Sequence, residues 1–341
     1  MNKIYKLFDE KFISNFFDKE VLPLYPDFKE IKKIKIIPHK KLIWEKTYHV
    51  VVEFKTYLSN GEKTRIFPIF CSAHSDEPRH NVYRALEYLW SHSFASSNLT
   101  IPRPLFYNQE FRGTFYQGVE GNNLYHYIKS GNRAMIEETI VRAAAWFYKL
   151  HNLPAAGVEN FNQENSRIKT VFPGFRRMLR IVRNRYPEYE KLFKIFFDKF
   201  STFEKIFLMS TDKRWLIHGD AHPENIIRIS REKTAVIDFT DICLSDFARD
   251  LGCFLQQLEF MIMRKIGEAD YAQKVKDVFL KSYLENAKIE LSINLLERIN
   301  NYYNWTAVRT AIFFLTKAEP EPDRAVPLIK TISKKLGIKI I

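Results

Sequence analysis

The feature that most constrains this chain is a change of hydrophobic pattern about one third of the way along. Residues 40–117 contain short runs rich in Val, Thr and aromatic residues, whereas the apolar residues after position 124 mostly recur every three or four positions. The first pattern is typical of strands and the second of amphipathic helices. The sequence therefore predicts an α+β fold of two lobes with a cleft between them, a β-rich N-lobe and a mainly helical C-lobe.

The β-rich N-lobe is expected at residues 40–117, after an N-terminal helical extension at residues 1–39. In this extension Phe8, Phe12, Phe16 and Phe17 lie close to one helical stripe. Asn60-Gly61 is a strong hairpin signal. Strands are expected on both sides of this turn and again before residue 118, with one helix between them, at Tyr48–Tyr57, Thr64–Cys71, Asn81–Trp90 (the helix) and Gly113–Gln117.

The helical C-lobe is expected at residues 118–341. Its helices are predicted at Met135–His151, Phe175–Asn184, Pro187–Phe207, Asp246–Ile266, Tyr271–Ala287 and Ile293–Thr316. One region interrupts the helical pattern with three short strands, at Trp215–His218, Ile226–Ile229 and Thr234–Phe239. Polar and acidic residues gather at the ends of these strands, where functional sites are usually assembled.

Composition favours a folded globular protein, because 46% of the 341 residues are hydrophobic and 27% are charged. Three cysteines are too few for a disulfide framework. The sequence has no run of 18 apolar residues, and Asp9 and Glu10 interrupt the region where a secretory signal would need apolar residues. These observations predict a cytoplasmic protein.

The strongest chemical signal is a set of oxygen-bearing side chains around the three short strands. Asp220 and Asn225 are five positions apart, and Asp238 follows the apolar end of the last strand. Two carboxylates and one amide oxygen suit Mg²⁺, with one carboxylate left to accept a proton. The pattern is typical of phosphoryl transfer, with Asp238 and Asn225 as metal ligands and Asp220 as the catalytic base that orients the substrate hydroxyl.

These motifs resemble a known family of small-molecule kinases. The segment His218–Asn225 (HGDAHPEN), followed by Ile237–Phe239 (IDF) and Asp246–Asp250 (DFARD), is similar to the aminoglycoside phosphotransferase and choline kinase family, which has the protein-kinase-like fold. The resemblance covers roughly residues 40–315. It implies Mg²⁺-dependent transfer of the terminal phosphate of ATP or GTP to a hydroxyl of a small-molecule acceptor.

The resemblance also implies roles for residues outside the oxygen ligands. Gln117, Gly118 and Val119 would form the interlobe hinge and contact the nucleotide base through backbone atoms. Asp246 and Asp250 are interpreted as structural residues that order the catalytic loop and cap the next helix, because an Asp before a helical run is ordinarily an N-cap. His218 is expected to orient the loop, and the role of His222 is left open.

The sequence departs from the family in the first lobe. Family members usually carry a Lys on the third strand that contacts the nucleotide phosphates and is held by a Glu on the following helix. Here Ile66–His74 has no Lys, the helix has no acid before Glu87, and the first 60 residues have no Gly. Lys55 and Arg79 are the candidate substitutes. The alternative hypothesis is therefore a pseudokinase, a nucleotide- or ligand-binding module with little or no catalysis.

Charge and aromatic residues bear on the acceptor. The net charge is +13, and Ser166–Arg185 holds seven basic residues and no acid. We interpret this run as an ordinary surface helix, and the sharper hypothesis is an anionic acceptor. No nucleic-acid-binding motif accompanies the charge. The family's acceptor pocket usually involves the C-terminal helices, but the aromatic stripe there is expected to be core, at Tyr302, Tyr303 and Trp305, next to Arg309.

A dinuclear metal phosphoesterase is a third reading of the same side chains. Such sites combine Asp, His and Asn ligands, which His218, His222 and the three oxygen ligands could imitate. They normally need additional histidines farther along the chain. The nine histidines of this sequence end at His222, which argues against this class.

Overall fold

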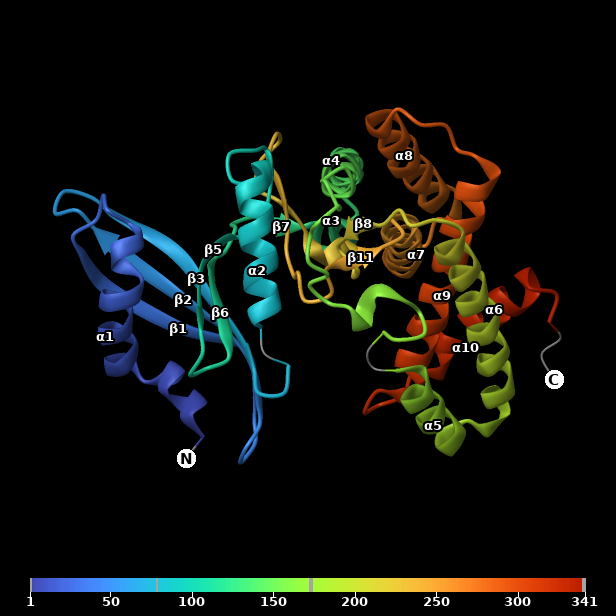
Figure 1. The fold of residues 1–341 in the computed structure, drawn as a ribbon, viewed down its shortest axis with the longest axis horizontal. Coiled ribbons are helices and arrows are strands. Elements are labelled where there is room, and N and C mark those ends of the chain that lie inside the picture. Colours follow the sequence, from blue (N-terminus) through green and yellow to red (C-terminus); the bar gives the residue numbers. More distant parts are fainter. Residues whose placement is uncertain (1, 78, 172–173, 339–341) are drawn as a thin grey trace. The chain divides into compact units, whose positions relative to one another are not determined.

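The computed structural model describes residues 2–77, 79–171 and 174–338, which belong to two compact units (Figure 1). The first unit comprises residues 1–122 and 227–240, and the second comprises residues 123–226 and 241–341. The first is built on a sheet and the second on helices, as the change of hydrophobic pattern predicts. The segment 227–240 belongs to the first unit, although the residues before and after it in the chain belong to the second.

A five-stranded antiparallel sheet forms the framework of the first unit. Its strands are β1 (Glu30–Ile43), β2 (Tyr48–Ser59), β3 (Thr64–His74), β5 (Arg103–Asn108) and β6 (Gly113–Gln117), in the spatial order β1-β2-β3-β6-β5. Strands β2 and β3 form the predicted hairpin, and the Asn60 side chain accepts hydrogen bonds from the backbone N–H groups of Glu62 and Lys63. The register of this hairpin places His49 opposite His74.

The N-terminal segment packs its aromatic residues against this sheet. It contains the 3₁₀-helices η1 (Lys3–Phe8) and η2 (Leu22–Leu24) on either side of helix α1 (Glu10–Glu20). The Phe17 ring lies 4.9 Å from the ring of Phe54 on β2, and the Phe16 ring lies 5.6 Å from that of Phe115 on β6. The segment is therefore part of the core of the first unit.

The structure differs from the sequence prediction within residues 1–39. Helical structure ends at Leu24, and strand β1 already starts at Glu30, so residues 30–39 form a strand where a helical extension was expected. The local sequence Glu30–Ile37 (EIKKIKII) pairs with β2. The pairing satisfies the backbone hydrogen-bonding groups of the strand. It outweighs the moderate helix propensity of the Lys and Glu residues in this segment.

The rest of the first unit is a helix and a smaller sheet. Helix α2 (His80–Leu89) continues into a π-helical turn, η3 (Trp90–Phe94). The smaller sheet has the order β4-β10-β9-β7. Its strands are β4 (Leu99–Thr100), β7 (Asn122–Asn123), β9 (Ile226–Arg228) and β10 (Thr234–Val236).

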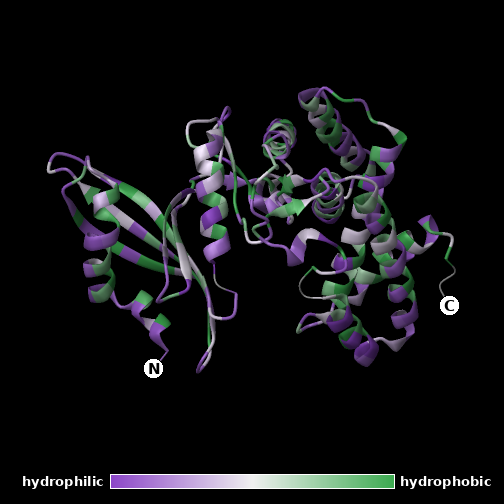
Figure 2. Ribbon diagram, in the orientation of Figure 1, coloured by the Kyte–Doolittle hydropathy of each residue, from purple (hydrophilic) through white to green (hydrophobic). Residues whose placement is uncertain are grey.

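The second unit is mainly helical, and its helices carry bands of hydrophobic and hydrophilic residues (Figure 2). Helix α7 packs against α9 and α8, α4 packs against α8, and α9 also contacts α6 and α10. The helices are α3 (Leu124–Ser130), α4 (Arg133–His151), α5 (Phe175–Arg185), α6 (Glu190–Ser210), α7 (Ala248–Lys265), α8 (Ala269–Ala287), α9 (Ile293–Thr316) and α10 (Pro322–Lys335). Short 3₁₀-helices are η4 (Glu164–Ser166), η5 (Pro187–Tyr189) and η6 (Pro223–Asn225).

One two-stranded ribbon lies within this helical unit. Strand β8 (Trp215–Ile217) pairs antiparallel with β11 (Cys243–Ser245). The six predicted helices of this region and the strands that begin at Trp215, Ile226 and Thr234 are confirmed, while α3, α10 and β11 were not predicted. The ribbon positions the loop that leaves β8, which carries the residues described next.

Candidate active site

The loop after β8 folds as it does because residue 219 is a glycine. Gly219 has φ +82°, and a Cβ at this position would lie 2.2 Å from the backbone oxygen of Asp241 and 2.6 Å from Nδ2 of Asn165. Both the left-handed backbone and the close approach exclude a side chain. The residue before Asp220 therefore has to be Gly for the loop to pass this close to Asp241.

Asp250, in the first turn of α7, fixes the start of the same loop. Its carboxylate accepts hydrogen bonds from the backbone N–H of His218 at 2.7 Å and of Gly219 at 2.9 Å, and it contacts Nε2 of His151 at 3.0 Å. Burial alone would raise the pKa of Asp250, but the His151 contact and the charge on His151 outweigh burial and lower it. The predicted role of Asp250 in ordering the loop is confirmed, whereas the predicted helix cap is not, because Asp250 lies inside the first turn of α7.

Asp246 also has the predicted structural role. Its Oδ1 accepts a hydrogen bond from the backbone N–H of Ala248 at the start of α7. The same oxygen forms an ion pair with Arg298 of α9 at 2.7 Å. Burial raises the pKa of Asp246 to about 6, opposed by the positive charge of Arg298. The residue thus ties the first turn of α7 to α9.

Asp220 carries its carboxylate next to the imidazole of His222. The distance from Asp220 Oδ2 to His222 Nε2 is 3.4 Å, and His222 Nδ1 accepts the backbone N–H of Glu224. The second contact leaves the proton of a neutral His222 on Nε2, facing Asp220. Burial opposes ionisation of Asp220, but the His222 hydrogen bond and the charges of His222, His218 and Arg309 hold its pKa below the ordinary value. His222, whose role the sequence left open, is a residue that orients Asp220.

Asn225 is buried at the end of η6 and is held by Asp220. Its Nδ2 donates to the backbone oxygen of Asp220 at 3.1 Å. Within the described ranges, Oδ1 of Asn225 makes no hydrogen bond. The fold therefore brings Asp220 and Asn225 together and leaves one amide oxygen for a hard cation.

Asp238 belongs to the first unit, in the turn after β10. It has φ +65°, a left-handed conformation that Asp tolerates better than most residues. Its Oδ1 accepts the backbone N–H of Thr240 at 3.4 Å, a weak contact. Burial is the largest influence on His49 of β2, whose pKa it lowers, and on Tyr116 of β6, whose pKa it raises. The charge on Asp238 acts on both groups and raises the pKa of each. The Asp238 carboxylate thus lies near residues of the main sheet.

His49, on which the charge of Asp238 acts, has other basic groups around it in the same unit. The rings of His49 and His74 are 4.6 Å apart, and Nδ1 of His74 accepts the backbone N–H groups of Asp76 and Glu77. Burial lowers the pKa of His49 to about 4, and the charges of Lys40 and Arg79 lower it further. Arg79 is therefore one of the cations around His49.

The two candidate substitutes for the missing strand Lys differ in their surroundings. Arg79 is buried just before α2, contacts Glu77 at 3.3 Å and has no hydrogen-bond partner for Nε among the described residues. Lys55 on β2 is half-exposed, 4.0 Å from the Glu53 carboxylate. Only Arg79 has a charge that acts on the same histidine as Asp238.

The hinge residues continue directly from β6. Gln117 ends the strand, and its Oε1 accepts the hydroxyl of Tyr25 at 2.9 Å. The backbone N–H of Gly118 donates to the oxygen of Pro68 at 2.7 Å and is thus occupied. Across the described part of the chain, the N–H of Val119 has no hydrogen-bond acceptor. Of the three predicted hinge residues, Val119 is therefore the one with a free backbone donor among the described residues.

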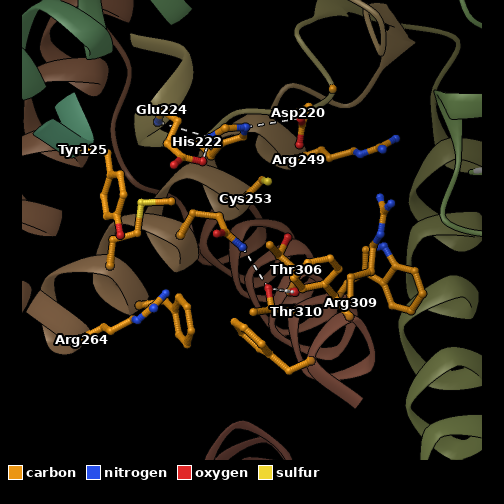
Figure 3. Close-up of a pocket in the computed structure, with 17 residues that line it drawn as sticks. Tyr125, Asp220, His222, Glu224, Arg249, Cys253, Arg264, Thr306, Arg309 and Thr310 are labelled. Atoms are coloured by element: carbon orange, nitrogen blue, oxygen red, sulfur yellow. Dashed lines mark hydrogen bonds and ion pairs between the residues drawn. The ribbon is translucent and has the colours of Figure 1, made fainter. Parts of the chain in front are cut away.

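A pocket of about 530 Å³ lies within the second unit beside Asp220 (Figure 3). This volume suits a small molecule. The loop after β8 contributes Gly219, Asp220, His222 and Glu224, and α3 contributes Tyr125. The remaining wall comes from α7 and α9. Sequence reasoning placed no residue of α3 or α7 in a pocket, because α3 was not predicted and the residue spacing of α7 marks it only as a helix.

The C-terminal aromatic residues are largely core, as predicted. Tyr302 and Trp305 are each 2% exposed, while Tyr303 is half-buried. Trp305 and Arg309 also line the pocket, so α9 contributes to both the core and the pocket wall. The helical period identifies the buried face of α9 but cannot show that the edge of this face borders a pocket.

A second set of loop supports was not predicted from the sequence. Both Nη atoms of Arg249 donate to Asn165, and Asn165 Nδ2 donates to the backbone oxygen of Asp241 at 2.7 Å. Arg249 and Asn165 are buried. Asn165 lies in a long connection without a motif, so its sequence carries no signal of this role.

Residues 175–185 of the basic run form the surface helix α5, the residues from 167 to 171 before it form turns, and residues 172–173 lie outside the described residues. Helix α5 buries Phe175, Met178 and Val182, while Arg183 contacts Glu190 at 2.7 Å. Arg185 donates to the backbone oxygen of Lys317 after the end of α9. None of the described α5 residues lines the pocket beside Asp220. The interpretation as a surface helix is confirmed.

The described ranges hold neither a membrane-spanning helix nor a cluster of metal-binding side chains. None of the helices there is long and apolar enough to span a membrane. Within residues 2–77, 79–171 and 174–338, no group of three or more His, Cys, Asp or Glu side chains is placed to hold a metal ion.

Comparison with known proteins identifies the family. Residues 49–284 match the family model described as the phosphotransferase enzyme family, and this range covers more than half of the chain. The chain belongs to this family. A search of curated protein sequences finds no match.

Solved structures share the fold at low sequence identity. A choline kinase from Cryptosporidium parvum Iowa II has a TM-score of 0.60 and 11% identity, with 96% of each chain covered. A choline kinase from Streptococcus pneumoniae has a TM-score of 0.57 and 14% identity, with 95% of this chain and 99% of that chain covered. An amicoumacin kinase in complex with AMP-PNP has a TM-score of 0.56 and 13% identity, with 98% and 96% covered. The predicted protein-kinase-like fold is confirmed.

Proposed function

We propose that this protein is a small-molecule kinase that transfers the terminal phosphate of ATP or GTP to a hydroxyl group of a small acceptor. The observation that carries the proposal is the geometry of Asp220, whose carboxylate is oriented by His222, borders a pocket of about 530 Å³, and sits on a loop that also fixes Asn225. Family membership and the kinase neighbours support the same assignment.

In the proposed reaction the acceptor hydroxyl donates a hydrogen bond to Asp220. The hydroxyl oxygen forms a bond to the terminal phosphorus, the bond from this phosphorus to the bridging oxygen breaks, and the nucleoside diphosphate leaves. The hydroxyl proton passes to Asp220 and then to water. Because the pKa of Asp220 is held low, this carboxylate mainly orients the hydroxyl and takes the proton late, as a loose phosphoryl-transfer transition state allows.

Mg²⁺ fits the residues that the sequence assigns to it. Asn225 has an amide oxygen without a hydrogen bond in the described part of the chain, and the only hydrogen bond to the Asp238 carboxylate there is the long one from Thr240. Carboxylate and amide oxygens are hard ligands, and Mg²⁺ usually takes few protein ligands because phosphates and water complete its shell. We propose that Asn225 and Asp238 hold it. When bound, Mg²⁺ neutralises charge on the nucleotide phosphates.

The first unit supplies the proposed nucleotide contacts. Val119 is the hinge residue whose backbone N–H is free for the base, whereas Gln117 and Gly118 shape the hinge through their contacts with Tyr25 and Pro68. Arg79 takes the place of the missing strand Lys, because its charge acts on the same histidine, His49, as the charge of Asp238, and its Nε lacks a protein partner among the described residues. Lys55 is the weaker candidate because it lies beside Glu53.

The test is formation of ADP or GDP with a mixture of hydroxyl compounds and Mg²⁺. Asp220→Asn should lower kcat by about 10²- to 10⁴-fold, the usual contribution of a positioned base, while nucleotide binding is retained. Asp212→Asn, at an exposed position before β8, is the matched control and should have wild-type activity. Nucleotide binding without turnover by the wild type would reject the kinase and favour the pseudokinase alternative.

A further inference from the structure

The wall of the pocket beside Asp220 has an unusual charge distribution. The lining residues on α7 and α9 include three arginines, Arg249, Arg264 and Arg309, and among the described residues these helices add no carboxylate to the wall. The acidic lining residues, Asp220 and Glu224, both belong to the catalytic loop. The part of the pocket away from the reacting carboxylate is therefore cationic.

The three arginines differ in what they contact. Arg249 is buried and donates to Asn165, so its charge is used inside the protein. Arg264 is exposed, and its charge lowers the pKa of Glu321. In the part of the chain that the structure describes, the guanidinium of Arg309 has no hydrogen bond and no ion pair. Its one recorded effect is on Asp220, whose pKa it lowers.

Arg309 is placed to meet a ligand. It is half-buried on α9 and lines the pocket on the same side as Arg249, as Figure 3 shows. The neighbouring hydroxyls of Thr306 and Thr310 donate to backbone oxygens of their own helix and, being uncharged, supply no counter-charge. A half-buried guanidinium without a carboxylate is most stable when an anion accepts its forked N–H groups.

We infer that the acceptor carries an anionic group, a phosphate, sulfate or carboxylate, that binds Arg309 while the hydroxyl of the same molecule contacts Asp220. The inference rests on the proposed kinase function and specifies its substrate class. It assigns the anion to α9 instead of the basic run, because the described residues of α5 do not line this pocket. A cationic acceptor would meet repulsion from Arg264 and Arg309.

The first experiment separates failure of this inference from failure of the proposed function. Nucleotide binding is measured first, and its absence would count against the kinase. Diphosphate release is then compared for matched acceptors: glucose, glucosamine, glucose 6-phosphate and glucuronate, and glycerol, choline, glycerol 3-phosphate and glycerate. Turnover should favour the phosphate or carboxylate members. Preference for neutral or cationic members, or no turnover of any anion by a protein that phosphorylates the other members, would overturn the inference, whereas no turnover of any member would count against the kinase.

Variants assign the effect to Arg309. Arg309→Gln should raise KM for the preferred anion by about 10- to 100-fold, the loss expected for hydrogen bonds to a charged group, and Arg309→Lys should restore part of it. Arg180→Gln, an exposed position on α5, is the matched control and should leave KM unchanged. Equal KM values for Arg309→Gln and Arg180→Gln would overturn the assignment.

A second measurement does not depend on finding the acceptor. Cys253 lines the pocket and is partly exposed, whereas Cys71 and Cys243 are buried. Cys253 is modified with two methanethiosulfonates, the anionic sulfonatoethyl and the cationic trimethylammonioethyl reagent. The ratio of the two rates reports the charge near Cys253, and Cys253→Ser is the control for specificity. Arg309→Gln should lower the anionic-to-cationic rate ratio by about threefold. A ratio that does not change would show that Arg309 does not face the ligand space and would overturn the inference.

Discussion

Replacing Gly219 by Ala should disable catalysis by displacing the loop that carries Asp220. The added Cβ would lie 2.2 Å from the backbone oxygen of Asp241, whereas Cβ contacts below 3.0 Å essentially never occur. Either the loop or the Asp241 backbone has to move by roughly 0.8 Å. Misplacement of about 1 Å at a reacting centre costs about 10²-fold in rate, so kcat should fall by about two orders of magnitude.

The control for this prediction is Gly267→Ala. Gly267 has φ +81°, almost the same as Gly219, but nothing lies within 4 Å of its added Cβ. Both variants lose about 1–2 kcal/mol from the left-handed backbone, and only Gly219→Ala adds the collision. Diphosphate release and urea unfolding of both variants separate the two effects. Equal activity and equal stability of the two variants would refute the packing argument.

Three further predictions concern titratable residues of the second unit. Asp250→Asn should lower the free energy of unfolding by about 3–5 kcal/mol, because it breaks a buried charged contact with His151, and thermal unfolding should show a lower midpoint. Burial raises the pKa of Glu204 from 4.5 to about 7, so the folded state binds more protons than the unfolded state between these values. Stability should therefore fall by about 3 kcal/mol as pH rises from 4.5 to 7, and Glu204→Gln should remove this slope in urea titrations; an identical slope would contradict the assignment. His222→Ala should raise the pKa of Asp220, so the acid limb of the pH–rate profile should move to higher pH; an unmoved limb would show that His222 does not hold Asp220 ionised.

The residue pattern predicts the catalytic loop well because its constraints are local. The five-residue spacing of Asp220 and Asn225 matches a single loop in which one backbone oxygen accepts from the other residue's amide. The structural role of Asp250 also follows from its position near a helix start, since its carboxylate reaches back to two loop N–H groups. Such signals lie within a short stretch of chain.

The residues that the sequence does not reveal act across long separations. Asn165 supports Asp241 through a contact between segments 76 residues apart, and no periodicity marks such a partner. Strand β1 is missed at its start because its Lys and Ile residues fit a helix as well as an edge strand. Arg309 is visible in the sequence, but only the fold shows that it borders the same pocket as Asp220.

Thermal unfolding with nucleotides tests the central claim most directly. Wild type and Asp238→Asn are compared with ATP and with GTP, each with and without Mg²⁺. A nucleotide at about 100 times its Kd should stabilise the native state by about 2.7 kcal/mol and raise the midpoint by about 4 °C. The account predicts a Mg²⁺-dependent rise in the wild type that Asp238→Asn loses. No rise with either nucleotide at millimolar concentration would contradict the kinase assignment.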